Sequence, residues 1–383
     1  MAIYLIIFAI SVILFFISEQ IHLNFLKKLL VLLGLLIPSL LAGLRSLYIG
    51  TDVLNYVYPL FSIAKNSPNY LQYLSMPSLN GGIIQTVSSY EYGYTFLTYL
   101  VAKLIGSFQV LQVLIEFFIL SFIYSGISRL KIKNVSIWLC MATYYLLFFN
   151  NSLNMVRQWM AMAIILFGFK YIKNQDLPKF LITILCACLF HSTAIIGLLF
   201  YFIYWIIKAS DSKYFALSSY SNSTISITAI SFISIVIISC IILLLINKVY
   251  AILGTIGLSK YSYYLSGTFA FSVNQFLLKM PILLLLSINI NDTFKKNYKI
   301  FFYLIVTLDV IISQLASLSD YSIRISTYVG MFNIYGYTIL SDSDNKIKMI
   351  IIRSLVIIYL LFYWYYLYCV KGNDQTVPYM FFY

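Results

Sequence analysis

The first apolar run of the chain, AIYLIIFAISVILFFIS from Ala2 to Ser18, contains no charged residue. At about 1.5 Å per residue, a helix of this length comes close to crossing the hydrocarbon core of a bilayer, which is about 30 Å thick. No basic residue precedes the run and no small-residue cleavage site follows it. We therefore expect a retained membrane span and not a removable signal peptide.

Comparable runs recur along all 383 residues, of which 62% are hydrophobic and only 10% are charged. Soluble domains carry about a quarter charged residues, so an ordinary soluble protein is excluded. The composition predicts an all-α, polytopic transmembrane helical bundle of about 10–13 membrane helices, some of them short or re-entrant. We expect one integral membrane domain over residues 1–383, with outer-face loops at about 45–90 and 247–273.

Apolar length gives the expected spans. They are 2–18, 29–44, 91–106, 108–127, 134–149, 155–172, 178–190, 192–207, 224–246, 274–290, 300–317, 325–340 and 349–368. Lysine and arginine clusters at their ends define an expected cytoplasmic side, opposite the two long loops and the turn at His191. With this assignment Arg129 to Lys133 falls on the wrong side, so we expect that one of the two helices within 91–127 does not fully cross.

The net charge of +13 comes mostly from lysines at the ends of apolar runs. This placement is typical of topology signals and of attraction to anionic head groups of a phospholipid bilayer, and it does not predict nucleic acid as a partner. The five cysteines form no C-x-x-C pair and the chain has two histidines. We therefore expect no disulfide framework, no metal site and no cofactor.

Arginine is rare in this chain, which has twenty lysines and five arginines, at positions 45, 129, 157, 324 and 353. Its planar fork binds phosphate or carboxylate in a bidentate manner and stays charged in a dry site. Arg45, Arg157 and Arg324 lie at the expected outer ends of spans, where each needs a local anion. They predict an anion site, or else each extends to head groups or pairs with an acid such as Asp52 or Asp320.

Two acids stand at expected helix starts on the outer side. Asp52 follows Gly50 and Thr51, a trio that suits a turn and an N-cap for a helix from Val53. Asp52 is also a candidate for three other roles: an ion-pair partner of Arg45, a ligand of a sugar hydroxyl, or a catalytic base. Glu91 has the same two interpretations, as a group stabilised by the helix dipole or as a site residue.

Polar residues also interrupt the stretch NNSLNMVRQWM, which contains Asn154, Arg157 and Gln158. Amides at this depth suit hydrogen bonds to carbohydrate hydroxyls or to the backbone of a broken helix. His191, in CLFHSTAII, lies at an expected turn and is either a packing residue or part of a polar pocket. Glu116 and Asp309 lie within spans, where an acid is either functional or hydrogen-bonded inside the bundle.

Several of these stretches together resemble the EpsG family, polytopic proteins of exopolysaccharide synthesis that are related in role to Wzy-type O-antigen polymerases. LRSLYIGTDVLNYVYPLF (44–61) resembles the family's R-x(n)-G-T-D-x-x-x-Y block, and YEYGYTFLTYL (90–100) its E-x-G-[YF] segment. NMVRQWMAMAI (154–164) and FHSTAI (190–195) resemble its R-Q-x-x-A helix and F-H-x-[ST]-A turn. IRISTYVGMFNI (323–334) and VPYMFFY (377–383) resemble its last two blocks, with Val329 where an aromatic residue is usual.

The resemblance implies a GT-C-like membrane glycosyltransferase, independent of metal, in the bacterial inner membrane. Such an enzyme moves a growing glycan from undecaprenyl diphosphate onto a lipid-linked repeat unit at the periplasmic face, in lipopolysaccharide or exopolysaccharide biosynthesis. A chain-length regulator is a further implied partner. The implied diphosphate and sugar ligands are Arg45, Asn154, Arg157, Gln158, Arg324 and Tyr328. The implied catalytic residues are Arg157 with Asp52, His191 or Glu91, among which Asp52 is our first choice of base and His191 our second.

Other classes fit parts of the pattern. A lipid-linked oligosaccharide flippase also binds diphosphate with arginines, but two related halves and a basic central cavity are expected of it. A membrane acyltransferase is expected to have an early histidine with acidic or arginine partners, a setting that His22 lacks. An O-antigen ligase uses closely related chemistry, and the residues alone do not separate it from a polymerase.

Overall fold

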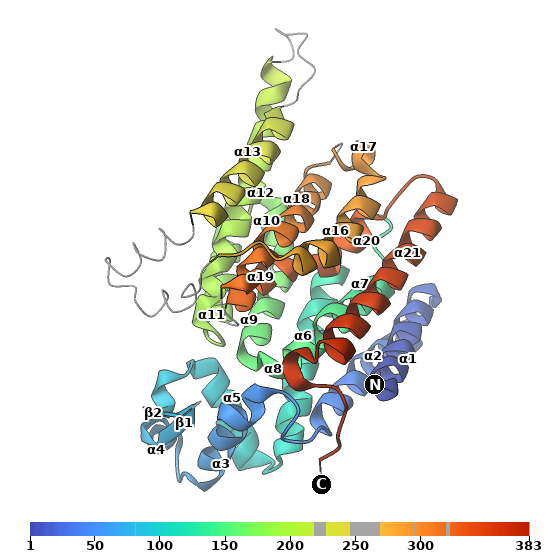
Figure 1. Cartoon of the computed structure of the whole chain (residues 1–383). Helices are drawn as coiled ribbons and strands as arrows, with labels where there is room; N and C mark the ends of the chain where they lie inside the picture. The colour runs from blue at the N-terminus through green and yellow to red at the C-terminus, as the bar shows by residue number, and fades with distance from the viewer. Residues whose placement is uncertain (81, 218–226, 246–268, 295, 319–321, 383) are drawn as a thin grey trace. The chain divides into compact units, whose positions relative to one another are not determined.

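The computed structural model describes residues 1–80, 82–217, 227–245, 269–294, 296–318 and 322–382 (Figure 1). The chain forms two compact units. Unit 1 comprises Met1–Gly197 and Leu360–Tyr383, and unit 2 comprises Leu198–Tyr359. Asp320 and most of the expected loop 247–273 lie outside the described residues.

The first part of unit 1 has the following elements. They are α1 (Ala2–Gln20), α2 (Asn24–Gly43), the π-helix η1 (Val53–Val57), α3 (Tyr58–Asn66), α4 (Tyr70–Ser75), β1 (Pro77–Asn80), β2 (Ile83–Thr86), η2 (Val87–Ser89), α5 (Tyr92–Leu104) and α6 (Phe108–Arg129). β1 and β2 form an antiparallel hairpin in which Pro77 pairs with Thr86.

The rest of unit 1 has shorter elements. They are α7 (Ile137–Tyr144), the π-helix η3 (Tyr145–Phe149), α8 (Asn150–Asn154), α9 (Val156–Phe167), α10 (Phe169–Asn174), α11 (Leu177–Cys188), η4 (Ser192–Ile196), η7 (Tyr365–Val370) and η8 (Asn373–Gln375). The expected spans 134–149 and 155–172 are thus not single α-helices. A π segment interrupts the first and a break at Gly168 interrupts the second.

The secondary-structure elements of unit 2, in the part of the chain that the structure describes, are all helices. Its elements are α12 (Gly197–Leu217, which begins at the last residue of unit 1), α13 (Ile227–Leu244), α16 (Val273–Ser287), α17 (Ile290–Thr293), α18 (Asn297–Ile312), η6 (Ser313–Ser317), α19 (Ser322–Gly330), α20 (Asn333–Leu340) and α21 (Lys346–Trp364, which ends in unit 1).

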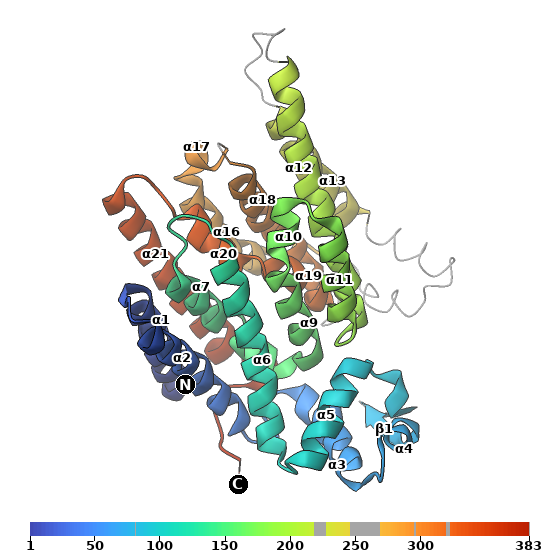
Figure 2. The same cartoon turned by 180° about the vertical axis from the view of Figure 1, so that it is seen from behind.

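Aromatic packing forms much of the core of unit 1. The rings of Tyr4 and Phe8 on α1 contact those of Phe149 and Trp364, with centroids 5.0–6.5 Å apart. All four side chains are at most 3% exposed. In both views α1, α2 and α6 lie side by side (Figures 1 and 2). Burial of these large rings removes apolar surface from solvent and holds the polar ends of the helices in place.

Six helical segments in the described part of the chain are long and apolar enough to cross a membrane. They are Ala2–Gln20, Asn24–Gly43, Phe108–Arg129, Ser192–Ala209, Asn297–Ser317 and Lys346–Val370. The prediction of an all-α polytopic membrane protein is confirmed. α5 is not among the six: its 13 residues span about 20 Å, well short of a hydrocarbon core of about 30 Å. This length agrees with our expectation that one helix within 91–127 does not fully cross.

Candidate active site

Asp52 lies in the first turn after a close approach between two segments of unit 1. Gly50 has a φ of +85°, and a Cβ there would lie 2.5 Å from the carbonyl oxygen of Leu153. Only glycine fits this position, since it tolerates positive φ and has no side chain. The position places Thr51 and Asp52 against Asn154: Thr51 Oγ1 donates to Asn154 Oδ1 at 2.6 Å, and Asp52 N donates to the same oxygen at 3.3 Å.

The expected N-cap role of Asp52 is wrong. Its backbone has helical angles, φ −61° and ψ −28°, and its side chain accepts no capping hydrogen bond. The carboxylate instead accepts a hydrogen bond of 2.6 Å from the hydroxyl of Tyr56, one turn further along. An N-cap residue needs an extended backbone to direct its oxygen back to the helix, and Asp52 does not have one.

Arg157, at the start of α9, contacts the faces of two tyrosines. Its guanidinium carbon lies 4.6 Å from the ring centroid of Tyr56 and 4.8 Å from that of Tyr90. Its Nη1 forms an ion pair of 2.5 Å with Oε2 of Glu91. Stacking and a directed ion pair together need the planar arginine head, which explains why lysine does not stand here. Nε has no hydrogen-bond partner among the described residues.

Glu91 joins Arg157 to the histidine turn. It precedes α5 at the N-cap position but makes no side-chain cap. Its Oε1 accepts a hydrogen bond of 3.1 Å from the backbone N–H of Ser192 and lies 3.2 Å from Nδ1 of His191. Burial opposes ionisation of Glu91, but His191 and the charge of Arg157 outweigh it and lower the pKa of Glu91 to about 2.

A second glycine brings the histidine turn into range. Gly93 N donates to the carbonyl of Leu189 at 2.8 Å, and a Cβ on Gly93 would lie 2.7 Å from that oxygen. The start of α5 therefore packs directly on the backbone that precedes His191. The glycines of the G-T-D and E-x-G blocks serve the same purpose, because each lets one backbone approach another beside a polar residue.

The C-terminal segment contributes to the same cluster. Asn154 Nδ2 donates to Asp374 Oδ1 at 2.9 Å, and Asn151 Nδ2 donates to Asp374 Oδ2 at 3.1 Å. Further along, Ser46 N donates to the carbonyl of Met380 at 2.8 Å, so the segment pairs with the chain around Arg45. The block VPYMFFY thus lies against the segment that leads to Asp52.

Arg45 is 3% exposed, and its Nη2 donates to the carbonyl of Leu153 at 3.1 Å. Leu153 is also the residue that Gly50 approaches, so Arg45 belongs to the same neighbourhood as Asn154. Burial lowers the pKa of Arg45 to about 10, and the charge of Glu116 opposes this change. The guanidinium is therefore cationic at neutral pH.

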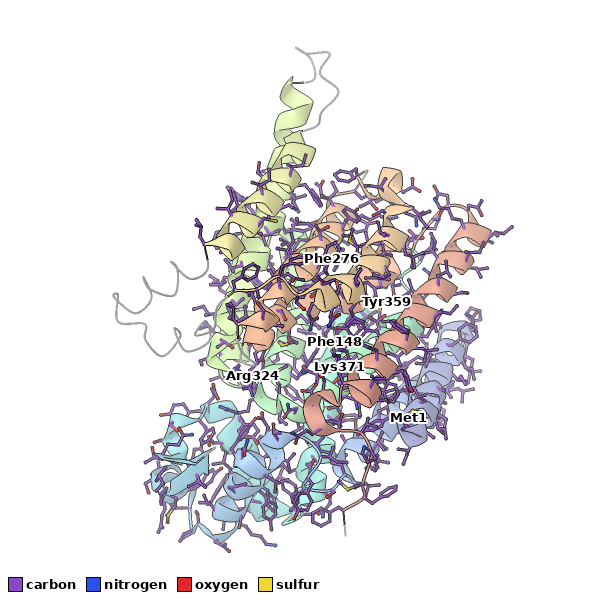
Figure 3. The ribbon with its side chains drawn as sticks, viewed as in Figure 1. Met1, Phe148, Phe276, Arg324, Tyr359 and Lys371 are labelled. Atoms are coloured by element: carbon purple, nitrogen blue, oxygen red, sulfur yellow. The ribbon has the colours of Figure 1, made fainter. Side chains whose placement is uncertain are left out.

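The other predicted site residues are Gln158, Arg324 and Tyr328. Gln158 is buried, and its Nε2 contacts Met162 Sδ at 3.6 Å. Arg324 is on α19 of unit 2 (Figure 3). Tyr328 is on the same helix and is 1% exposed. The structure therefore brings together Asp52, Glu91, Asn154, Arg157 and His191, with Arg45 adjoining, and it gives no support for placing Gln158 among them.

The acids within spans are hydrogen-bonded inside their units. Glu116 accepts hydrogen bonds from Tyr144 at 2.7 Å and from Ser152 at 3.2 Å. Asp309 pairs with Lys279 at 2.5 Å and accepts from Asn333 at 2.9 Å. We expected these acids to be either functional or hydrogen-bonded inside the bundle. The geometry shows the internal hydrogen bonds.

Sequence reasoning missed three members of the cluster as site residues. Tyr56 stands four residues after Asp52, about one helical turn further along in the D-x-x-x-Y block, and that spacing was a usable signal. Tyr90 directly precedes Glu91, but a single tyrosine does not stand out in a chain that has 35 of them. Asp374 lies 220 residues from Asn154, and no local pattern links the two.

The cluster combines a cation held against two aromatic rings, a histidine beside a carboxylate, and a second carboxylate. Arg157, Glu91 and His191 have side chains that are 14–17% exposed, so they are accessible at the edge of the core. Such a set can bind an anion and take up a proton. Within the described part of the chain, no three His, Cys, Asp or Glu side chains gather closely enough to hold a metal ion.

The comparisons with known proteins give one match. The model of the EpsG family matches residues 28–381, which is nearly the whole chain and includes every residue of the cluster. No curated protein and no solved structure matches.

Proposed function

The chain belongs to the EpsG family, whose members are polymerase-like membrane proteins of the Wzy type, and from this premise we propose a specific reaction for it. It transfers a growing glycan from undecaprenyl diphosphate to the sugar of a lipid-linked repeat unit at the outer face of the bacterial inner membrane. The polar cluster around Arg157 is the reaction site. A chain-length regulator would act on this membrane protein from outside the cluster.

The observation that carries the proposal is the setting of Arg157. Glu91 and the rings of Tyr56 and Tyr90 fix its guanidinium, and the side chain is still 16% exposed. A fixed and partly accessible cation is suited to bind a diphosphate and to stabilise the negative charge that develops on it as the glycosidic bond breaks. Arg45 adds a second positive charge next to Asn154.

His191 is a better candidate base than Asp52, our first choice from the sequence. Asp52 is 6% exposed and already accepts a hydrogen bond from Tyr56. His191 is more exposed, and its Nδ1 faces Oε1 of Glu91, which can stabilise the imidazolium as a carboxylate does in a catalytic triad. The other ring nitrogen is then the one that accepts the proton.

In the proposed step the acceptor hydroxyl oxygen forms a bond to the anomeric carbon of the donor glycan. The bond from that carbon to the diphosphate oxygen breaks, and the leaving undecaprenyl diphosphate keeps the electron pair. The hydroxyl proton passes to His191. Arg157 holds the diphosphate throughout, and Asp52 holds Tyr56 beneath the guanidinium through its hydrogen bond.

The test is to substitute Arg157→Ala and Arg157→Lys in the parent strain and to examine the surface glycan on a gel. Arg129→Lys, which changes an arginine outside the cluster, is the matched control. We expect the ladder of chain lengths to collapse to single repeat units in both Arg157 variants, at unchanged protein levels. A ladder that persists in both would refute the proposed role, and the loss of all surface repeats would indicate a flippase.

A further inference from the structure

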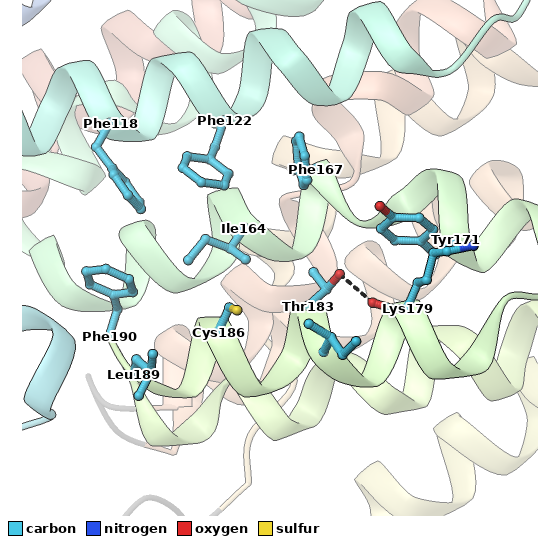
Figure 4. Close-up of a pocket in the computed structure, with 11 residues that line it drawn as sticks. Phe118, Phe122, Ile164, Phe167, Tyr171, Lys179, Thr183, Cys186, Leu189 and Phe190 are labelled. Atoms are coloured by element: carbon cyan, nitrogen blue, oxygen red, sulfur yellow. Dashed lines mark hydrogen bonds between the residues drawn. The ribbon is translucent and has the colours of Figure 1, made fainter.

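An apolar groove of about 430 Å³ lies on unit 1 between α6, α9 and α11 (Figure 4). Its walls include Phe118 and Phe122 from α6, Phe167 from α9, and Cys186 and Phe190 from the region of α11. The one hydroxyl among its lining residues besides Tyr171, that of Thr183, donates to the carbonyl of Lys179 at 2.9 Å. The groove therefore offers mostly hydrocarbon and aromatic surface.

The groove opens on a face that suits lipid. On α11, Leu185 is 67% exposed, Ile182 is 60% exposed and Leu181 is 41% exposed. Such a continuous exposed apolar surface is expected where a helix meets the bilayer interior. A lipid chain that entered the groove from the bilayer would not have to pass through water.

One end of the groove adjoins the polar cluster. Leu189 and Phe190 line it, and the next residue is His191. The carbonyl of Leu189 accepts the hydrogen bond from Gly93 N, two residues beyond Glu91. The groove and the charged groups thus share one stretch of backbone.

The other end lies toward the start of α11, at Lys179. From Leu189 to Lys179 the helix extends about 15 Å, which is about half the hydrocarbon thickness of a bilayer. The groove therefore leads away from the polar cluster along one helix, over a length that accommodates several isoprene units.

We propose that this groove binds the prenyl chain of the lipid-linked diphosphate substrate. The inference rests on the proposed function, because it takes the polar cluster to hold the diphosphate. The first isoprene units are covalently attached to that diphosphate and must lie next to it, and the groove is the apolar surface that begins there. Methyl-branched, unsaturated units pack well on phenylalanine faces, so the lining favours a prenyl chain over a straight acyl chain.

The test compares two ligands and three variants of the purified full-length protein in detergent. Undecaprenyl diphosphate has a long tail, and dimethylallyl diphosphate has a single isoprene unit and serves as the head-group probe. Cys186→Trp fills the groove, and Leu185→Trp adds the same ring to the neighbouring exposed position outside it. Arg157→Ala removes the cation.

We expect Cys186→Trp to weaken the binding of undecaprenyl diphosphate at least tenfold, because buried apolar contact is lost. The affinity for dimethylallyl diphosphate should change less than twofold. Leu185→Trp should leave both ligands unaffected. Equal binding of undecaprenyl diphosphate by Cys186→Trp and by the unsubstituted protein overturns the groove proposal. Unchanged binding of both ligands by Arg157→Ala overturns the proposed diphosphate site instead, so the two failures are distinguishable.

A second measurement needs no bulky substitution. Cys186 is exposed, whereas Cys140 is buried, so replacement of Cys188, Cys240 and Cys369 by serine leaves one reactive thiol in the groove. Undecaprenyl diphosphate should slow its modification by N-ethylmaleimide several-fold, and phosphatidylglycerol at the same concentration should not. Equal protection by both lipids would show a general lipid surface and would overturn the proposal.

Discussion

Two ion pairs, one in each unit, have the same length and different surroundings. Arg157 and Glu91 lie 2.5 Å apart at the starts of two helices in unit 1. Lys279 and Asp309 also lie 2.5 Å apart, but within α16 and α18 of unit 2. Asp309 has one oxygen on Lys279 and the other on Asn333, so both carboxylate oxygens accept a hydrogen bond. Around Arg157 and Glu91 the contacts extend to a histidine and two tyrosines, and all three charged or titratable side chains are 14–17% exposed.

If the proposed function is correct, this difference separates a structural charge pair from a reactive one. A pair within a membrane bundle is stabilised when each group has its partner and no donor is spare. A site for an anionic substrate needs a cation that is held in place but not fully occupied. Arg157 and Lys279 match these two roles. A guanidinium has five N–H donors in a planar fork, so Arg157 can pair with Glu91 and still bind a second anion, whereas the ammonium of Lys279 is a compact point charge.

The largest expected effect comes from Glu91→Gln. The substitution removes the anion that fixes Arg157 and that faces His191, so we expect the rate of polymer formation to fall by about a thousandfold. The measurement is chain extension in proteoliposomes with a lipid-linked repeat unit. Asp309→Asn is the matched control, since it neutralises the acid of the other pair. A rate loss in Asp309→Asn as large as that in Glu91→Gln would remove the distinction between the pairs.

The second prediction concerns stability. Asp309→Asn leaves the partly buried Lys279 without its anion and should lower the free energy of unfolding by about 3 kcal/mol. The double variant Lys279→Met with Asp309→Leu removes both charges and should recover most of that loss. Denaturant unfolding in detergent measures both. If the double variant were as unstable as the single one, the pair would have a role beyond mutual neutralisation.

The third prediction concerns pH. The pKa of Glu91 falls from an ordinary 4.5 to about 2 in the folded protein. Folding therefore favours the ionised carboxylate, and its contribution to stability is fully present above about pH 4.5 and is lost as the pH falls toward 2. The difference in unfolding free energy between the unsubstituted protein and Glu91→Gln should narrow over this window. A difference independent of pH would contradict the role of Glu91 as the counterion.

The smallest expected effect comes from Asp374→Ala. It removes the acceptor of Asn154 and Asn151 without touching Arg157, so we expect KM for the lipid-linked repeat unit to rise about fivefold, with kcat little changed. Asn373→Ala, at an exposed neighbouring position, is the control. A large fall in kcat in Asp374→Ala would place Asp374 in the reaction itself.

Apolar length predicted the long spans closely. Residues 2–18 and 108–127 were expected as helices, and the structure has α1 at Ala2–Gln20 and α6 at Phe108–Arg129. Apolar length did not predict the π segments at Val53–Val57 and Tyr145–Phe149, because a change of helix type leaves no hydrophobic pattern in the sequence. Packing and hydrogen bonds between distant segments decide such local departures.

The site was predictable where a residue type is rare. In a chain with few charges, Asp52, Glu91, Arg157 and His191 stand out, and the structure brings them together. Tyr56 and Tyr90 do not stand out among many tyrosines, although their rings hold the guanidinium. The capping prediction for Asp52 was wrong because turn residues and a following helix describe the local backbone well but do not show that Tyr56 takes the carboxylate.

The pairing of the C-terminal segment with Ser46, and the contact of Asp374 with Asn154, also bear on how the protein matures. Ribosomes deliver Arg45 and Asp52 to the membrane long before Asp374, which follows Asn154 by 220 residues. Until that segment has been inserted, the amides of Asn151 and Asn154 lack their acceptor, and Ser46 N lacks the carbonyl of Met380 to which it donates. A partly synthesised chain in the membrane therefore holds the charged groups without the assembled cluster, and the cluster is completed only when the C-terminal segment has been translated.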